Sequence, residues 1–240
     1  MRNTITIAAF RRPDYLKQVL DSLTVALRFC PEFSPHVIVV GVDQFADGSR
    51  REDVLDVIRE FGHQRLEVIE WNERLGINEH PRRLCMYAFS KLESDFNLHL
   101  EDDTVLSPDA LSLAQWFFDG HSARRVLNLY SPSLTYDSPD ELRLGSGFHA
   151  WGWGCNFNVW EKLSLHWNHR ISYPIGWDWS VTDTMDLYGF ATVHPVLSRV
   201  RNIGRLNGWH QTPEGYDRDF AGQVAAGNWD ACKKWRLVTK

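Results

Sequence analysis

The sequence predicts an α/β fold with a mainly parallel, doubly wound central sheet flanked by helices. Through the first 120 residues, short β-branched runs alternate with segments whose apolar residues recur at helical spacing. The chain has 240 residues and is 43% hydrophobic, which is enough for one domain with a sizeable core. Beyond residue 120 the alternation stops, and loops rich in Trp, Gly, Pro and Asp are expected.

The expected elements follow one another in a regular order. The run Thr4–Phe10 is β-branched, and Pro13 then suits the first turn of a helix, where its missing N–H costs nothing. The run His36–Asp43 is apolar almost throughout, as a strand buried on both faces should be. Further strands are expected at 66–71, 96–100 and 126–130, and helices at 15–27, 54–61, 78–93 and 111–118, the last of these after the capping residue Ser107.

Composition and charge exclude several classes of protein. With 11 Trp, 13 Phe and 7 Tyr the chain is too aromatic to be disordered. Its net charge of −5 gives no general attraction for nucleic acid. No apolar run approaches the ~20 residues of a membrane helix, the first residues do not resemble a signal peptide, and the four cysteines form no CxxC motif. We therefore expect a cytoplasmic enzyme; the basic tail after Trp229 is read as solvated, with peripheral contact at the inner face of a membrane left open.

The acidic run Glu101-Asp102-Asp103 is the strongest chemical signal. It directly follows the fourth expected strand, and ligands of open α/β sheets bind in the crevice at the carboxyl ends of the strands. Adjacent carboxylates suit a hard cation such as Mg²⁺ or Mn²⁺, which usually also holds phosphate oxygens. The alternative is a solvated acidic turn that caps the helix starting near Ser107, and the position after a strand favours the metal site.

Other strand ends fall at the same edge. The stretch Ala8–Arg11 and the acid Asp43 end the first two strands, where Phe10 could stack on a base and Asp43 could accept from a base or a ribose. Arg82 and Arg83 begin the helix that leads to the acidic strand, from where a guanidinium could meet a diphosphate. Taken singly, an acid at a strand end is more often a turn residue and a helical arginine is more often solvated. Because no Gly-rich phosphate loop is present, a metal and arginines would have to hold the phosphates.

These motifs resemble glycosyltransferases of the GT-A fold, in which a strand-end acidic motif holds a metal and a nucleotide-sugar. Family-2 glycosyltransferases are similar in the first half, and the particular likeness is to inverting enzymes of the N-acetylglucosaminyltransferase I type. The motifs that carry the resemblance are Glu101–Asp103 followed by Pro108-Asp109, the turn Trp151–Gly154, the pair Trp177-Asp178, and Pro195, Ser198-Arg199 and Gly204-Arg205.

The resemblance implies a Rossmann-like sheet, a single domain over 1–240, and roles for individual residues. Residues 1–120 would form the nucleotide-binding half, and 121–240 the acceptor-binding and catalytic half. Asp178 matches the catalytic base; Trp179 stands where the family often has a second acid, so Asp183 is the reserve base. The other implied roles are metal ligand for Asp103, with His210 as a late second ligand, ribose or metal contact for Asp102, donor-sugar contact for Glu101, and uracil or ribose contact for Asp43.

The implied reaction is metal-dependent transfer of a sugar from a nucleoside-diphosphate sugar, with a UDP-sugar favoured, to a hydroxyl group of a glycan, glycolipid or glycoprotein. The cofactor would be Mn²⁺ or Mg²⁺, with Mn²⁺ favoured if His210 is a ligand. A carboxylate base placed opposite the departing nucleoside diphosphate would invert the anomeric carbon. The product would be a hexosyl- or N-acetylhexosaminyl-linked glycan.

Two further groups of residues carry expectations for this reaction. Six of the 11 tryptophans lie between 151 and 179; most suit core packing, and Trp151, Trp153 and Trp177 are expected to expose their rings to a sugar acceptor. Arg199 and Arg205 lie in a Gly-containing segment that could close as a lid on a diphosphate, or form a basic surface loop.

Two rival functions remain open. A sugar nucleotidyltransferase would need a Gly-rich basic loop after the first strand, and Phe10–Pro13 lacks the glycines. A non-catalytic carbohydrate-binding protein on the same fold would not depend on Asp178.

Overall fold

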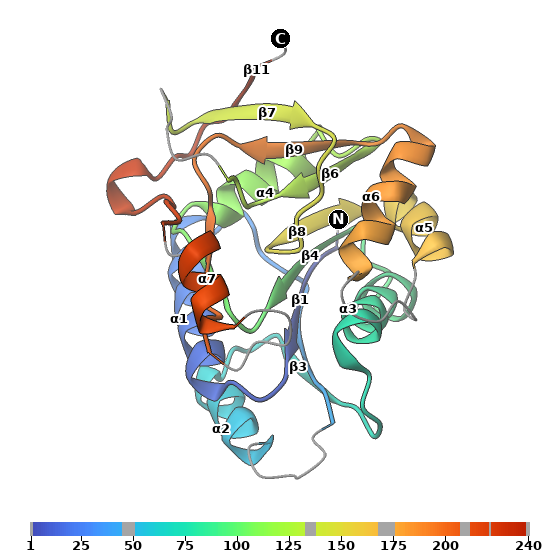
Figure 1. The fold of residues 1–240 in the computed structure, drawn as a ribbon, viewed down its shortest axis with the longest axis vertical. Coiled ribbons are helices and arrows are strands. Elements are labelled where there is room, and N and C mark those ends of the chain that lie inside the picture. The colour runs from blue at the N-terminus through green and yellow to red at the C-terminus, as the bar shows by residue number, and fades with distance from the viewer. Residues whose placement is uncertain are drawn as a thin grey trace.

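The computed structural model describes residues 2–44, 51–132, 138–167, 176–206, 212–220 and 222–238. Their strands form a nine-stranded sheet in the order β11-β7-β9-β6-β8-β4-β1-β2-β3, with helices on both faces (Figure 1), and a separate pair β10-β5. The expected α/β class with a large central sheet is thus confirmed. The strands are β1 (Asn3–Ala9), β2 (Val37–Val42), β3 (Leu66–Glu70), β4 (Phe96–Glu101), β5 (Thr104–Leu106), β6 (Arg125–Asn128), β7 (Glu141–Gly145), β8 (Trp153–Asn156), β9 (Ala191–Pro195), β10 (Val200–Asn202) and β11 (Arg236–Val238). The helices are α1 (Pro13–Phe29), α2 (Arg51–Phe61), α3 (Gly76–Met86) with the π-helical turn η1 (Tyr87–Lys91), α4 (Ala110–Phe118), α5 (Phe157–His166), α6 (Trp177–Tyr188), α7 (Pro213–Asp219) and the 3-10 turn η2 (Asn228–Asp230).

The first half of the sheet is parallel. Strand β1 pairs in parallel with both β2 and β4, and β2 pairs in parallel with β3. In this register Ala8 lies between Gly41 on one side and Glu101 on the other. The carboxyl ends of β1, β2 and β4 therefore share one edge, where ligands of such sheets bind.

The second half of the sheet is mixed. Strand β8 inserts between β4 and β6 and runs antiparallel to both, whereas β6 and β9 are parallel. Gly154 of β8 packs against β4 so closely that a Cβ atom there would lie 2.6 Å from the ring of Phe96. This mixed half of the sheet was not predicted beyond the strand at 126–130, because its strands are only three to five residues long.

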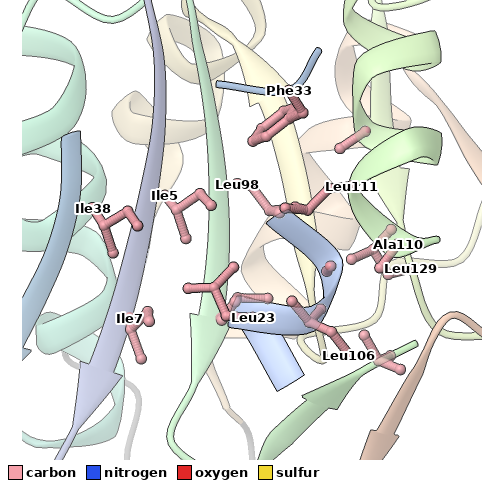
Figure 2. Packing of buried hydrophobic residues seen from close by; sticks show 14 of the residues in the cluster. Ile5, Ile7, Leu23, Phe33, Ile38, Leu98, Leu106, Ala110, Leu111 and Leu129 are labelled. Carbon is pink, nitrogen blue, oxygen red and sulfur yellow. The ribbon is translucent and has the colours of Figure 1, made fainter. Parts of the chain in front are cut away.

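Two apolar cores lie on opposite faces of the sheet. Helices α1, α2 and α4 pack on one face, and Figure 2 shows Ile5 and Leu98 of the sheet together with Leu23 of α1 and Leu111 of α4. On the other face, α5 and α6 enclose an aromatic cluster that includes Trp153. The alternation of apolar residues in the sequence predicted the first core well, since it is built from long, regular helices.

Helix boundaries differ from the sequence prediction at two places. The segment expected to be helical at 78–93 begins earlier, contains Pro81 in its interior and ends in a π-helical turn. The N-cap residue of α4 is Asp109 and not Ser107, whose hydroxyl instead donates to Asp109 Oδ1 (2.7 Å). No helix within the described ranges is both long and apolar enough to span a bilayer.

Candidate functional site

The acidic residues 101–103 lie at the carboxyl end of β4, beside the end of β1. The backbone N–H of Asp102 donates to the carbonyl of Ala8 (3.1 Å), and the N–H of Phe10 donates to Asp102 Oδ2 (3.0 Å). On the other side of β1, the N–H of Asp43 donates to the carbonyl of Ala9 (3.0 Å). Asp43 and Asp102, which are 59 residues apart in sequence, thus flank the end of one strand.

Arg12 neutralises part of this acidic cluster. Its guanidinium pairs with Asp102 Oδ1 through Nη2, and with Asp103 Oδ2 through Nη1 at 2.7 Å. Burial alone would lower the pKa of Arg12, but the two carboxylates outweigh it and raise that pKa. Arg12 was not among the residues selected from the sequence. Pro13 could have indicated the position of Arg12. Because Pro13 begins α1, Arg12 is the N-cap residue of that helix and lies just after the end of β1.

Asp103 keeps one carboxylate oxygen without a partner. The residue is 6% exposed, and Oδ1 is buried with no hydrogen bond among the described residues. Burial raises the pKa of Asp103, opposed by the charge of Arg12. Burial also raises the pKa of Glu101 well above its usual value, and the Asp103 carboxylate adds to that shift. Such a crowded acid group favours a cation that supplies more positive charge than one arginine.

The segment after β10 closes over Asp103. The N–H of Ile203 donates to the carbonyl of Asp103 (2.8 Å), and Gly204 lies directly against its side chain. Farther along, the N–H of Leu206 donates to the hydroxyl of Tyr15 on α1 (3.1 Å). The acidic site is therefore bounded by β1, β4, α1 and the segment 203–206.

Asp43 is tied to the start of α3. Its carboxylate accepts from the N–H groups of Gln44, Leu75 and Gly76, each at 2.8 Å. This capping function fixes the loop that leads into α3 and favours a negative charge at the helix N-terminus. The expected contact of Asp43 with a base or ribose would have to add to these bonds.

His80 is a second site neighbour that the sequence analysis did not select. It is 4% exposed, its Nε2 has no partner among the described residues, and a Cβ at Gly41 would lie 2.8 Å from that atom. Burial lowers the pKa of His80 to about 4, although the nearby Asp43 and Asp102 carboxylates oppose the shift. A neutral imidazole hence borders the site at neutral pH.

Asp178 is the second residue of α6. It lies in the first helical turn, half-buried, and a Cβ at Gly176 would lie 2.5 Å from its Oδ1. Its charge raises the pKa of Glu101 further, which brings the candidate base and the acidic cluster into electrostatic range of one another. The reserve base, Asp183, lies on the exposed face of α6.

Two of the three expected acceptor tryptophans are buried, which corrects the expectation that they expose their rings. Trp153 is 1% and Trp177 is 2% exposed, and their ring centroids lie 6.0 Å apart within the aromatic core. Trp151 is half-buried and packs edge-to-face on Phe220. Beside these residues, the ring of Trp179 is exposed, at 61%.

Arg199 is not a lid residue, a second correction. It is fully buried, and its Nε pairs with Asp109 Oδ2 at 3.0 Å while its guanidinium packs over the ring of Trp235. Arg205 is exposed and forms a bidentate ion pair with Asp217, both distances being 2.7 Å. The lid hypothesis is therefore wrong for Arg199 and stays a prediction for Arg205.

The remaining expected donor residues line the edge more loosely. Arg11 is exposed, and its guanidinium lies 5.5 Å from the centroid of the Phe10 ring, as does that of Arg74. Arg82 is half-buried and pairs with Glu79 on its own helix (3.2 Å). The predicted metal ligand His210 lies outside the described residues.

The acidic site fits a divalent cation only in part. Within the described ranges no three or more His, Cys, Asp or Glu side chains are arranged to hold a metal ion. The buried, unpartnered Oδ1 of Asp103 is nevertheless the kind of ligand that a hard cation requires. Mg²⁺-type ions commonly use one or two carboxylates and take their other oxygens from substrate phosphates, so the donor set fits a metal that arrives with a diphosphate.

Comparisons with solved structures confirm the fold. The chain is similar to the mannosyltransferase PcManGT from Pyrobaculum calidifontis, solved with GDP-Man and Mn²⁺, at a TM-score of 0.57 and 16% identity over 81% of this chain and 54% of that one. It is also similar to S. aureus TarS, at a TM-score of 0.54 and 16% identity over 82% of this chain and 35% of that one. The chain thus spans about half or less of the length of these structures. No family model and no curated protein matches the sequence.

Proposed function

We propose that the protein is a metal-dependent, inverting glycosyltransferase of the GT-A type that uses a nucleoside-diphosphate sugar. The observation that carries the proposal is the cluster of Glu101–Asp103 and Arg12 at the carboxyl edge of a parallel sheet, with Asp178 within electrostatic range of Glu101. The fold shared with a mannosyltransferase that was solved with GDP-Man and Mn²⁺ supports it. The motif resemblance favours a UDP-sugar and an N-acetylglucosaminyltransferase I type of site.

The residues at this edge of the sheet have different proposed roles. Asp103 would hold Mn²⁺ or Mg²⁺ through its free Oδ1, and the bound metal would neutralise charge on the departing diphosphate. Asp102 would contact the ribose or the metal, and Glu101 the donor sugar. Asp178, at the N-terminus of α6, would take the proton from the acceptor hydroxyl, which is a poor nucleophile until it is deprotonated.

The acceptor is proposed to be the hydroxyl of a glycan-type molecule bound in the second half of the chain. The exposed Trp179, next to Asp178 in α6, offers an aromatic surface to a sugar ring, and the half-buried Trp151 is a second candidate. A panel of free, lipid-linked and protein-linked glycans would identify the class of acceptor.

Release of nucleoside diphosphate tests this function. Purified protein is incubated with UDP- and GDP-sugars, Mn²⁺ and a panel of glycan acceptors, and released nucleoside diphosphate is measured. Asp178→Asn should lower turnover by roughly 100-fold or more, because general-base catalysis contributes about 10²–10⁴, while the affinity for the nucleotide stays unchanged. Asp183→Asn, on the exposed face of the same helix, is the matched control and should keep its activity.

Each alternative predicts a different result. If Asp183→Asn abolishes turnover and Asp178→Asn does not, the assignment of the base is wrong. If no nucleotide sugar is consumed while glycans still bind, the chain is a carbohydrate-binding protein on this fold and the proposal fails.

A further inference from the structure

We propose that Arg12 is a built-in counter-cation that keeps a divalent metal off Asp103 until the diphosphate of the donor draws the guanidinium away. Metal binding would then depend on nucleotide binding. The inference rests on the proposed function, because it assumes that Asp103 is a metal ligand.

The contacts of Arg12 are those of a bridging cation. One guanidinium nitrogen pairs with Asp102 and the other with Asp103, at 2.7 Å for the Asp103 pair, and the Arg12 side chain is only 16% exposed. Its guanidinium carbon also lies 5.7 Å from the centroid of the Tyr15 ring. The pairs leave Asp102 with neither carboxylate oxygen free, since Phe10 N–H occupies the other one.

The space around the pair is closed. A Cβ atom at Gly204 would lie 2.1 Å from Asp103 Oδ2 and 3.1 Å from Arg12 Nη1, so the segment after β10 covers both groups. A metal bound at Asp103 would therefore share a confined volume with a positive guanidinium. In a partly buried site the repulsion between the two cations is screened only weakly.

A diphosphate can relieve this conflict. A guanidinium binds phosphate oxygens in a bidentate manner as well as it binds carboxylates, so a donor diphosphate offers Arg12 an equivalent partner. Once Arg12 pairs with phosphate, the carboxylate oxygens of Asp102 and Asp103 that it had bound become free for the metal. The same diphosphate supplies further oxygen ligands, and metal and nucleotide would bind together.

Mn²⁺ titration calorimetry with and without UDP or GDP tests the proposal directly. Wild-type protein should bind Mn²⁺ weakly alone and about tenfold or more tightly with the nucleotide. Arg12→Met should bind Mn²⁺ without nucleotide at least about tenfold more tightly than the wild type, and the nucleotide should add little. Arg28→Met, an exposed arginine in the last turn of the same helix, should behave like the wild type.

A second variant and a second readout guard against loss of folding. Arg12→Met leaves two buried carboxylates without a counter-charge, so Mn²⁺ alone should raise its unfolding temperature more than that of the wild type. Arg12→Lys keeps the positive charge but pairs only as a point charge, so its Mn²⁺ affinity should lie between those of the wild type and Arg12→Met.

The outcomes separate this inference from the proposed function. If Asp103→Asn abolishes Mn²⁺ binding in the presence of nucleotide, but both Arg12 variants bind Mn²⁺ alone as weakly as the wild type, Arg12 does not control the site and the inference is overturned. If no variant binds Mn²⁺ with or without any nucleotide, the metal dependence in the proposed function is wrong, and the inference fails with it.

Discussion

Gly204 and Asp103 are in such close contact that no side chain fits between them: a Cβ atom at Gly204 would lie 2.1 Å from Asp103 Oδ2. The carboxylate cannot simply turn aside, because Arg12 holds that same oxygen at 2.7 Å. The glycine thus lets the segment after β10 close over the acidic site.

Gly204→Ala should destabilise the fold and loosen the site. The added methyl group must displace the Asp103 carboxylate from Arg12, and overpacking of this kind costs about 1–3 kcal/mol of unfolding free energy. Urea unfolding measures the loss. Gly222→Ala is the matched control, since a Cβ there meets nothing within 4 Å. Equal stability of the two variants would mean that segment 203–206 does not pack on Asp103 in solution.

Trp179→Ala should weaken acceptor binding. The indole is 61% exposed directly after Asp178, and an exposed indole presents a large apolar face with a polar N–H, which suits a sugar ring. The acceptor KM should rise about tenfold, equivalent to about 1.4 kcal/mol, with little change in kcat or in donor affinity. Trp229→Ala removes a fully exposed ring elsewhere and should change nothing. Identical kinetics for the two variants would exclude Trp179 from the acceptor site.

Arg199→Met should unfold far more easily than the wild type. Arg199 and Asp109 are both fully buried, so removal of the guanidinium leaves an unpaired buried carboxylate, which costs roughly 3–5 kcal/mol. The double variant Arg199→Met, Asp109→Asn should recover part of the loss. Arg205→Met breaks the exposed pair with Asp217 and should leave the denaturant midpoint unchanged. A comparable shift for both single variants would contradict the structural role of Arg199.

His80 should make the fold less stable as the pH falls. Its pKa is lowered from 6.5 to about 4 in the folded chain, so below pH 6.5 the unfolded chain takes up a proton that the folded chain refuses. Titration of His80 has no effect on the unfolding free energy above pH 6.5. Between pH 6.5 and about pH 4 it lowers the unfolding free energy by on the order of 3 kcal/mol.

Comparison of two variants isolates this effect from the carboxylates, several of which act in the opposite direction. His80→Gln should flatten the pH dependence of the unfolding free energy between pH 6.5 and 4, whereas His36→Gln, at an exposed histidine, should not. Parallel pH curves for wild type and His80→Gln would show that the imidazole is accessible to protons in the folded state.

The fold could be predicted from the sequence where the pattern of residues is local and long. The β-branched runs and helical spacing of the first 120 residues predicted the parallel strands β1 to β4 and the helices between them. Because strand ends in such a sheet share one edge, the placement of Glu101–Asp103 and Asp43 beside one another followed from element order alone. No property of residues 101–103 by themselves would have located them there.

The positions of side chains could not be predicted where they depend on one backbone angle or on one partner that is distant in the sequence. Trp151 and Trp153 were both expected to expose their rings, but Gly152 between them adopts a φ of +68°, and the two rings pack against different cores. Trp177 was expected to expose its ring, whereas it begins a helix that buries it and leaves Trp179 exposed. The partner of Arg199, Asp109, lies 90 residues earlier, and no spacing rule connects them.

Thermal unfolding with UDP, GDP, CMP and dTDP, each with Mn²⁺ and with EDTA, tests the central claim most directly. A nucleotide at about 100 times its dissociation constant stabilises the folded chain by about 2.7 kcal/mol. The account predicts a Mn²⁺-dependent rise in Tm with one nucleoside diphosphate, and its loss in Asp103→Asn. An unchanged Tm with every nucleotide, with or without Mn²⁺, would contradict it.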